Sequence, residues 1–562
     1  MRVRGTIAAL LSVLAVTFVQ AGSEPTRAAK GMVVSVNAIA SRVGADVLQD
    51  GGNAVDAAVA TAFALAVVHP SAGNIGGGGF MMFRAASGDA VAYDFRERAP
   101  AAAHPEMWLE NGEYSSEVHH RSALAVGVPG TVAGMHLAWR ERGSLPWARL
   151  VQPAIALARD GFTLSYGLAG SFARFVPRIQ QYPASVAVFT KAGAPYAPGD
   201  VWKQPDLAKT LQLIAENGPK GFYEGEVAQA LAGEMSRIGG MITVDDLKNY
   251  EAKTRVPIRG TYRGYEIISM PPPSSGGTAL VEMLNILEGH DVAGHGFGSA
   301  ANLHLMTESM RRAFADRARY IGDPDFVSDM PIARLTSKEY ATQLRQTITT
   351  GRASVSSPDT FEWPTESQET THYSVVDKDR NAVSVTYTLE GGYGVGVVVP
   401  GYGFLLNNEL GDFNAGPGIT NDRGLIGTTP NLAQPGKRPL SSMTPTIVAK
   451  DGQLFMVTGS PGGRTIINTV LQTIVNAIDY GMNAQEAVDA GRIHHQWLPD
   501  AISYEKHGFS PDTIALLEQW GHTVRETSGI GTDEVIINNV ADGVLEGGND
   551  YRAPDGGAVG VH

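Results

Sequence analysis

The sequence contains no cysteine among its 562 residues. This absence excludes a disulfide framework, a lipid-attachment cysteine, a thiolate nucleophile and a cysteine-ligated zinc ion. Positive charge is also scarce, because 44 Lys and Arg face 57 Asp and Glu, for a net charge of −13. Without a long Lys/Arg run, the chain offers no surface that would follow a phosphate backbone or an anionic bilayer. We therefore expect a small-molecule substrate, with neither nucleic acid nor a membrane as partner.

The N-terminus has the pattern of an exported protein. Basic residues at positions 2 and 4 precede an apolar run over about 7–19, and small residues lie near 19–21. This is the order of a signal peptide, and the apolar run is shorter than the roughly 20 residues of a spanning helix. We expect residues 1–21 to be removed and the protein to be periplasmic or extracellular.

Two early segments predict helices in a layered interior. Ile39, Val43 and Val47 recur at helical spacing before the glycines at 51–52, where a helix would end. Asn53 is a plausible cap for the next segment, 54–68, which is apolar on nearly every side, as in a helix buried between layers. Residues 150–350 have charged helical segments and are expected to form a supporting helical layer. Residues 350–369 are polar without periodicity and predict an exposed connector.

Two hairpins are predicted after this connector. In the first, β-branched alternating runs flank a polar turn centred on Asp379, which places Thr370 and Thr388 opposite each other on one face. The second has Asp451-Gly452 as its turn pair. It leads into GSPGG at 459–463 and then into a helix with apolar residues at helical spacing. Glycines at such a strand-to-helix turn expose backbone NH groups to a developing oxyanion or a carboxylate, although an ordinary tight turn has the same pattern.

These segments resemble the γ-glutamyltransferase family, and the resemblance covers nearly the whole chain. Its motifs are TTHYS at 370–374 and GSPGG at 459–463, together with GGNAVDAA at 51–58, HPSAGNIGGGGF at 69–80, DFRERAP at 94–100, GVPGTVAG at 127–134, MPPPSSGG at 270–277, GDPDF at 322–326, LLNNELGDF at 405–413 and PLSSMTPT at 439–446.

The resemblance implies an α+β fold of the N-terminal nucleophile hydrolase type, a four-layer αββα sandwich. It also implies a precursor that cuts itself between Glu369 and Thr370 into a large subunit, 22–369, and a small subunit, 370–562, intertwined in one fold. A freed α-amino group, with a pKa of about 7.7–8.0, would then act as the base for the Thr370 hydroxyl.

The resemblance also implies the roles of individual residues. Thr388 would hydrogen-bond Thr370, and the NH groups of Gly462 and Gly463 would form the oxyanion hole. Arg96, whose planar guanidinium can make two parallel bonds to a carboxylate, would hold the substrate α-carboxylate. Ser441 and Ser442 would assist Arg96, whereas Glu409 and Asp412 would hold the α-ammonium group.

Two positions depart from the family pattern. An asparagine is expected where Glu390 stands, in contact with the amino acid end of the donor. Arg423 lies where members with a lid often place an aromatic residue, in the expected lid at 417–428. Both departures bear on donor preference and lid closure, and neither alters the class of reaction.

Other motifs favour plain structural roles. The glycines at 73–79 are not followed by the Lys-Ser/Thr pair of a phosphate loop, so they predict close packing. His494 and His495 are adjacent and lack a carboxylate motif, so no metal site is expected there. The serines at 460, 274 and 275 do not form a G-x-S-x-G elbow, which disfavours a serine triad. No cofactor is expected.

Three hypotheses follow. The first is hydrolysis and transfer of the γ-glutamyl group of glutathione and other γ-glutamyl amides, with water, an amino acid or a peptide as acceptor. The second is a glutaryl-type cephalosporin acylase of the same fold. The third is an unprocessed secreted homologue without catalysis, which the presence of Thr370, Thr388 and the 462–463 glycines disfavours.

Overall fold

The computed structural model describes residues 23–357, 370–419 and 427–562. The expected signal peptide, Glu369 and Arg423 lie outside these described residues. Among the described residues, no helix combines the length and the apolar character needed to cross a bilayer.

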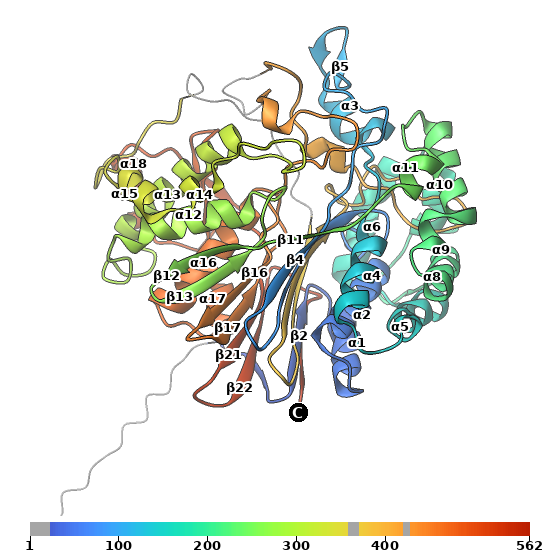
Figure 1. The fold of residues 1–562 in the computed structure, drawn as a ribbon, viewed down its shortest axis with the longest axis horizontal. Coiled ribbons are helices and arrows are strands. Elements are labelled where there is room, and N and C mark those ends of the chain that lie inside the picture. The colour runs from blue at the N-terminus through green and yellow to red at the C-terminus, as the bar shows by residue number, and fades with distance from the viewer. Residues whose placement is uncertain (1–22, 358–369, 420–426) are drawn as a thin grey trace, which may run out of the picture.

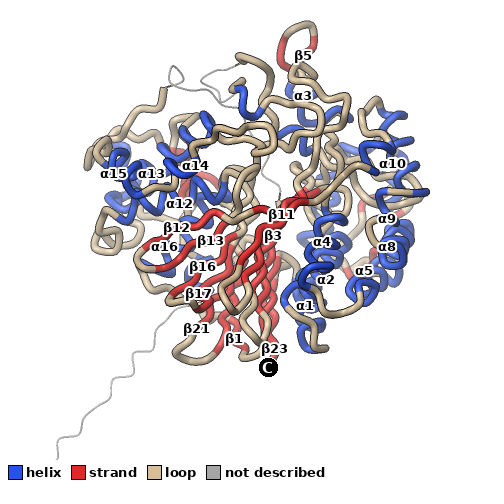
Figure 2. The backbone as a smooth tube through the Cα atoms, viewed as in Figure 1, coloured by secondary structure: helices blue, strands red, loops and turns tan. Residues whose placement is uncertain are grey.

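Two seven-stranded sheets stack face to face at the centre of the molecule (Figures 1 and 2). The first sheet has the strand order β1 (Thr26–Ala28), β22 (Val544–Asn549), β21 (Glu534–Asn539), β17 (Gln453–Thr458), β16 (Thr446–Lys450), β13 (Tyr265–Ser269) and β12 (Ile258–Tyr262). The second has the order β11 (Lys253–Arg255), β4 (Ala90–Phe95), β3 (Gly78–Arg84), β15 (Ala382–Thr388), β14 (Thr371–Val376), β2 (Gly31–Ser35) and β23 (Gly557–Val561).

Both sheets mix strands from the two sides of the expected cleavage site. In the second sheet, β14 and β15 lie between β2 and β3, so segments before and after residue 369 alternate across it. In the first sheet, β13 pairs with β16 along its whole length. Separating the segments before and after residue 369 would therefore break both sheets.

Helices cover the outer face of each sheet, so the predicted four-layer αββα sandwich is confirmed (Figure 1). One layer contains α1 (Ala38–Gln49), α2 (Ala54–Val68), α4 (Thr131–Arg142), α5 (Trp147–Asp160), α6 (Tyr166–Phe175), α8 (Pro205–Asn217) and α10 (Gly225–Ile238). The other contains α12 (Gly276–Glu288), α13 (Ala300–Tyr320), α15 (Lys338–Arg345), α16 (Thr465–Asp479), α17 (Ala484–Asp489) and α18 (Pro511–Gln519).

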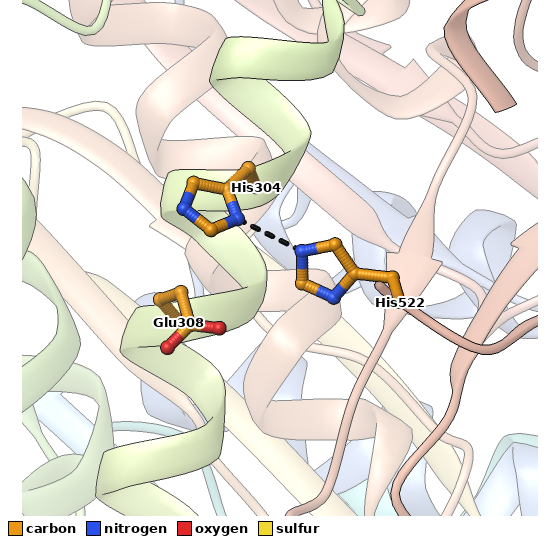
Figure 3. Close-up of side chains that lie close together, drawn as sticks. All are labelled: His304, Glu308 and His522. Atoms are coloured by element: carbon orange, nitrogen blue, oxygen red, sulfur yellow. Dashed lines mark hydrogen bonds between the residues drawn. The ribbon is translucent and has the colours of Figure 1, made fainter. Parts of the chain in front are cut away.

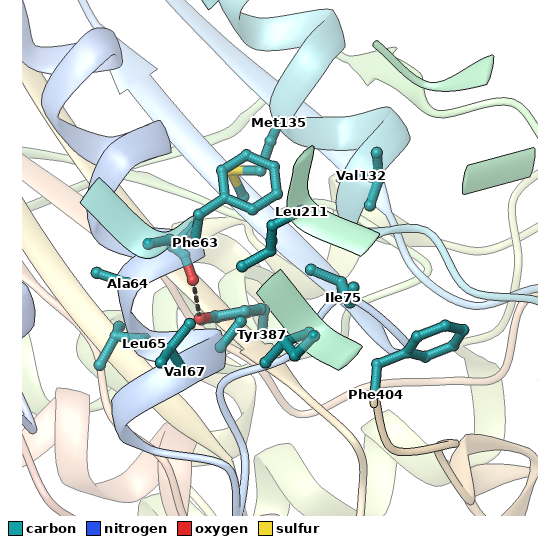
Figure 4. Packing of buried hydrophobic residues seen from close by; sticks show 14 of the residues in the cluster. Phe63, Ala64, Leu65, Val67, Ile75, Val132, Met135, Leu211, Tyr387 and Phe404 are labelled. Atoms are coloured by element: carbon teal, nitrogen blue, oxygen red, sulfur yellow. Dashed lines mark hydrogen bonds between the residues drawn. The ribbon is translucent and has the colours of Figure 1, made fainter. Parts of the chain in front are cut away.

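Three apolar cores correspond to the three spaces between the four layers. The largest packs α2 against the second sheet, where the Tyr387 hydroxyl donates to the Ala62 carbonyl at 2.9 Å (Figure 4). A second core lies between the first sheet and helices α12, α13 and α16. The third lies between the sheets, with Phe80 and Met82 of one sheet and Ile447 and Val457 of the other. Every residue of α2 is buried, as its all-round apolar sequence predicts.

The region 150–350 does not form a single supporting layer, which corrects the sequence-based expectation. Helices α5, α6, α8 and α10 belong to the layer over the second sheet, whereas α12, α13 and α15 cover the first sheet. The change occurs at β12 and β13, which are strands of the first sheet. The chain therefore crosses from one side of the sandwich to the other within this region.

Candidate active site

The first predicted hairpin forms and brings Thr370 to one edge of the sandwich. β14 and β15 pair with Thr371 opposite Tyr387 and Val376 opposite Ala382, so Thr370 and Thr388 stand at the next position of the same register. Thr370 is 8% exposed and Thr388 is 1% exposed. The Thr388 hydroxyl accepts a hydrogen bond from the Glu390 NH at 2.9 Å.

The glycine-rich segment 73–79 holds the end of β15 by close packing, as expected from its sequence. A Cβ atom on Gly77 would lie 2.1 Å from the Thr388 carbonyl oxygen, and one on Gly78 would lie 2.4 Å from the Phe95 oxygen. Asn74 donates to the same Thr388 oxygen at 2.8 Å. Side chains at these glycines would displace Thr388, so this segment positions a candidate catalytic residue.

The second predicted hairpin, β16–β17, leads through GSPGG into α16, which begins at Thr465. Gly462 and Gly463 have φ values of +128° and +56°, which favour glycine. Within the described part of the chain, neither of their NH groups donates a hydrogen bond. Two unsatisfied NH groups beside Thr370 and next to a helix start are suited to an oxyanion.

Arg96 follows β4 and is completely buried. Its guanidinium donates to one carboxylate oxygen of Glu409 and to one of Asp412, and to the Leu440 carbonyl at 3.0 Å. The residues assigned to the two charged ends of the substrate thus contact each other directly. The sequence-based assignment kept them at separate groups of the ligand and did not predict this ion pair.

The buried group around Arg96 contains more carboxyl groups than cations, and the pKa values of two of these carboxyl groups are raised. Glu97 lies with one oxygen 4.0 Å from the Arg96 guanidinium, and neither of its carboxylate oxygens has a hydrogen-bond partner among the described residues. Burial raises the pKa of Glu97 to about 7. Burial also raises the pKa of Glu409 well above its usual range, and the neighbouring carboxyl groups of Glu97 and Asp412 add to this effect. A ligand bringing positive charge would relieve this excess.

A small cavity, about 20 Å³, lies between Thr370 and this charged cluster. This volume is enough for about one water molecule. We call it the donor cavity; its lining contains eight of the ten residues assigned from the sequence, and Arg96 lies behind its two acids. Its walls comprise Thr370, Thr388, Glu390, Glu409, Asp412, Ser441, Ser442, Met443, Gly463 and Ile466.

Several polar neighbours of the donor cavity were not assigned to the site from the sequence. Arg317 of α13 donates to the Ser442 hydroxyl at 2.9 Å. Asn408 donates to the Glu390 carboxylate, and the His120 ring lies 3.8 Å from it. Asn408 stands inside the LLNNELGDF motif, whereas Arg317 and His120 stand in no quoted motif. Only the tertiary fold reveals their positions.

His304, Glu308 and His522 lie close enough together in the α13 layer to resemble a metal site (Figure 3). The His304 and His522 rings share a hydrogen bond of 2.8 Å. Glu308 already accepts from Arg312 at 2.6 Å and from the Ser354 NH at 3.0 Å. Because protein cations neutralise this carboxylate, we assign the cluster a structural role in holding the segment that precedes residue 357.

His494 and His495 are likewise engaged by the protein. The His494 ring nitrogens contact Asn468 at 2.7 Å and Gln496 at 2.9 Å. The His495 ring contacts Asp500 at 3.1 Å and accepts from the Trp497 NH at 3.1 Å. These contacts use both nitrogens of each ring, in agreement with the structural role that the sequence favours.

Comparison with known proteins identifies relatives along almost the whole chain. The family described as Gamma-glutamyltranspeptidase matches residues 40–560. The glutathione hydrolase proenzyme of Escherichia coli is 51% identical over 536 residues, which are 94% of this chain and 92% of that protein. The acylase ACY 1 proenzyme of a Pseudomonas strain is 38% identical, over 96% of this chain and 95% of its own.

Solved structures of similar proteins also include an acylase and a γ-glutamyltranspeptidase. A cephalosporin acylase from Bacillus halodurans superposes with a TM-score of 0.85 at 28% identity, covering 98% of this chain and all of that one. The γ-glutamyltranspeptidase of Helicobacter pylori is 46% identical with a TM-score of 0.56, covering 56% of this chain and 91% of its own. From its motifs, its αββα sandwich and these matches, the chain belongs to the γ-glutamyltranspeptidase family.

Proposed function

We propose that this protein hydrolyses and transfers the γ-glutamyl group of glutathione and other γ-glutamyl amides, with Thr370 as nucleophile. The observation that carries the proposal is the donor cavity, in which Thr370 and Gly463 stand at one side and a buried arginine with several carboxyl groups lies at the other. An amino acid head group carries both charges that this cluster can pair. The Escherichia coli relative, a glutathione hydrolase proenzyme, supports the same activity.

Binding of the donor would exchange ion partners within the cluster. In the structure, the Arg96 guanidinium contacts Glu409 and Asp412 directly, and these two acids line the donor cavity. The α-carboxylate of a γ-glutamyl donor would replace these acids on Arg96, helped by Ser441 and Ser442. The α-ammonium would then bind the displaced acids, with Glu390 nearby. Because each charge keeps an opposite partner, the exchange avoids leaving a buried charge unpaired.

The proposed reaction has two steps. The Thr370 hydroxyl oxygen attacks the γ-carbonyl carbon while its proton passes to the free α-amino group, and the NH groups of Gly462 and Gly463 stabilise the oxyanion. The carbon–nitrogen bond then breaks, and the departing amine takes that proton. Water or an acceptor amine attacks the resulting ester and loses a proton through the same α-amino group. The ester bond breaks, and the Thr370 oxygen regains its hydrogen.

Maturation by cleavage between Glu369 and Thr370 is part of the proposal, because the α-amino group must be free. Two observations support it. The Escherichia coli and Pseudomonas relatives are named proenzymes. Solved γ-glutamyltranspeptidase chains from Helicobacter pylori and Pseudomonas nitroreducens cover only 56% and 57% of this chain, although 91% and 94% of their own lengths match. Such coverage is typical of relatives whose precursor is divided in two.

A glutaryl-type acylase remains the second candidate, because acylases are among the similar proteins. A glutaryl group has no ammonium to place beside Glu390, Glu409 and Asp412. The excess of acid in the donor cavity therefore favours the γ-glutamyl donor.

Residues 1–21 fit export to the periplasm or the cell exterior, and the mass of the protein recovered from a periplasmic fraction would test their removal.

Substitution of Thr370 tests both the nucleophile and maturation. Thr370→Ala should remain one chain and lose at least ~10⁴-fold in γ-glutamyl anilide hydrolysis, since no hydroxyl is left to attack. Thr370→Ser keeps the hydroxyl and should still be cut. Intact mass spectrometry should show two wild-type fragments, the smaller beginning at Thr370. Self-cleavage of Thr370→Ala at this bond would refute the mechanism.

A further inference from the structure

A second cavity opens on the other side of Thr370. It has a volume of about 650 Å³, and its walls include Thr370 and Gly462 together with parts of α6, the loop around Tyr393 and the segment 552–555. We call it the wide cavity. It shares the nucleophile with the donor cavity but none of the charged residues that line the donor cavity.

The order of strands places the two cavities on opposite sides of the nucleophile. Along one edge of the second sheet, Arg96 follows β4, Thr370 precedes β14, Val36 follows β2 and Asp555 precedes β23. Strands β3 and β15 separate β4 from β14, and β2 and β23 lie beyond β14. The donor cavity therefore lies toward β4, and the wide cavity, which Val36 and Asp555 line, lies toward β23.

The charge of the wide cavity is the reverse of that in the donor cavity. Its charged wall residues are Arg174, Arg178, Arg552 and Asp555, in a protein of net charge −13. The charge of Arg552 is neutralised by Glu505 at 2.6 Å and Asp550 at 3.0 Å. Arg178 donates to the carbonyl oxygens of Gly392 at 3.1 Å and Gly394 at 3.2 Å. This leaves more cations than anions facing the space.

Arg174 is the cation of this wall that is most available to a ligand. It lies near the end of α6 and is exposed. Among the described residues, no carboxylate pairs with it. An arginine in such a position can accept a carboxylate through two parallel hydrogen bonds.

The shape of a γ-glutamyl donor links these observations. With its amino acid head fixed near Arg96 and its γ-carbonyl at Thr370, an extended donor must direct its leaving group away from Arg96. That direction enters the wide cavity. The acceptor amine occupies the place of the leaving amine in the second step, so the same cavity receives it.

We propose that Arg174 is a specificity-determining residue of this reaction, because it contacts the free carboxylate of the leaving group and of the acceptor in the wide cavity. The chemical class is an amino acid or short peptide with an unblocked C-terminus. This inference rests on the proposed γ-glutamyl activity. It concerns recognition of the leaving group and the acceptor, to which the family motifs assign no residue.

The test compares two donors that differ only at the leaving group, γ-glutamylglycine and γ-glutamylglycinamide. The ratio of their kcat/KM values reports recognition of the carboxylate and cancels differences in folding or active fraction. In the wild type, the ratio should favour the acid about threefold to fivefold, the range of one exposed ion pair, and should approach one in 1 M salt. Arg174→Ala should reduce the ratio to about one at low salt, and Arg174→Lys should keep part of it.

Arg140→Ala provides the matched control, because Arg140 is an exposed cation on α4 that lines neither cavity. Its ratio should equal that of the wild type. An unchanged ratio in Arg174→Ala, or a wild-type ratio near one, would overturn the inference while leaving the γ-glutamyl activity in place. If the wild type releases no glutamate from either donor, the proposed function itself has failed.

Discussion

The donor cavity and the wide cavity differ in size, charge and enclosure, although both border Thr370. The donor cavity holds about 20 Å³ and places Glu390, Glu409 and Asp412 in its wall. The wide cavity holds about 650 Å³ and has an excess of arginine. A site with opposite charges on its two sides can orient a substrate that carries an ammonium at one end and a carboxylate at the other. The difference also implies that a substitution or a changed ligand group at the donor cavity lowers kcat/KM more than one at the wide cavity.

The largest effect is expected for a donor that lacks the ammonium group paired by the acids of the donor cavity. We predict that a γ-glutamyl anilide is hydrolysed roughly 10³-fold faster, in kcat/KM, than the matching glutaryl anilide. The physical reason is that a glutaryl group leaves buried carboxylates without their cation, and sites built around such groups reject analogues that lack the partner. Initial rates with both anilides at equal, low concentrations provide the measurement. Faster glutaryl turnover would assign the chain to the acylases and leave Thr370 as nucleophile.

Arg96→Lys should have the next largest effect. Lysine keeps the charge but cannot make two parallel hydrogen bonds to the substrate carboxylate, so donor kcat/KM should fall about 10²-fold, equivalent to one or two charged hydrogen bonds. Maturation involves no free α-carboxylate and should continue. The control is Arg438→Lys, another buried arginine, which pairs with Asp94 and lines neither cavity. Equal losses of maturation and turnover in Arg96→Lys would make its role structural.

The sequence predicts those parts of the site that depend on local pattern. The centre of the hairpin at Asp379 gives the register of Thr370 and Thr388, because antiparallel strands joined by a short turn have few possible alignments. The glycines of GSPGG indicate where α16 begins, and the all-round apolar segment 54–68 indicates a helix buried between layers. In each case the physical constraint acts between residues close in the chain.

Long-range contacts could not be predicted in the same way. Arg96 and Glu409 are 313 positions apart, and their direct ion pair depends on how the loop after β4 meets the turn at 409–412. Glu97 adjoins a residue assigned to the site, but only its burial beside Arg96 reveals its altered pKa. Arg174 stands on an ordinary helix, and its position in the wide cavity follows from the packing of α6. The predicted roles of the ten site residues stay predictions until they are measured.

Thr388→Ala tests the residue opposite Thr370, the nucleophile that both cavities share. The substitution removes the hydroxyl opposite Thr370, a hydrogen bond worth about 1 kcal/mol, so turnover of matured enzyme should fall about fivefold. Because Thr388 acts at the nucleophile, the loss should be the same for γ-glutamylglycine and its amide. Pre-steady-state acylation rates of matured enzyme provide the measurement. Unchanged acylation would remove Thr388 from the mechanism, and unequal losses would place it in leaving-group recognition.

The smallest expected effect is a change of donor selectivity with pH. Burial raises the pKa of Glu97 to about 7, so this carboxyl group is neutral below pH 7 and gains a negative charge above it, beside Arg96, Glu409 and Asp412. Burial also raises the pKa of the nearby Tyr223 and Tyr250, which therefore stay neutral. The added charge attracts an ammonium, which L-glutamate carries and glutarate lacks, whereas its repulsion of carboxylates acts on both compounds. As the pH rises, L-glutamate should therefore bind more tightly relative to glutarate when both are measured as competitive inhibitors. The ratio of Ki for glutarate to Ki for L-glutamate should rise a few-fold between pH 6 and 8.5. Deprotonation of the Thr370 α-amino group, which has an ordinary pKa of about 7.7–8.0, weakens both γ-carboxylates alike and cancels in the ratio. A ratio that is flat or falls with pH would show that the acid cluster does not titrate around a bound ammonium.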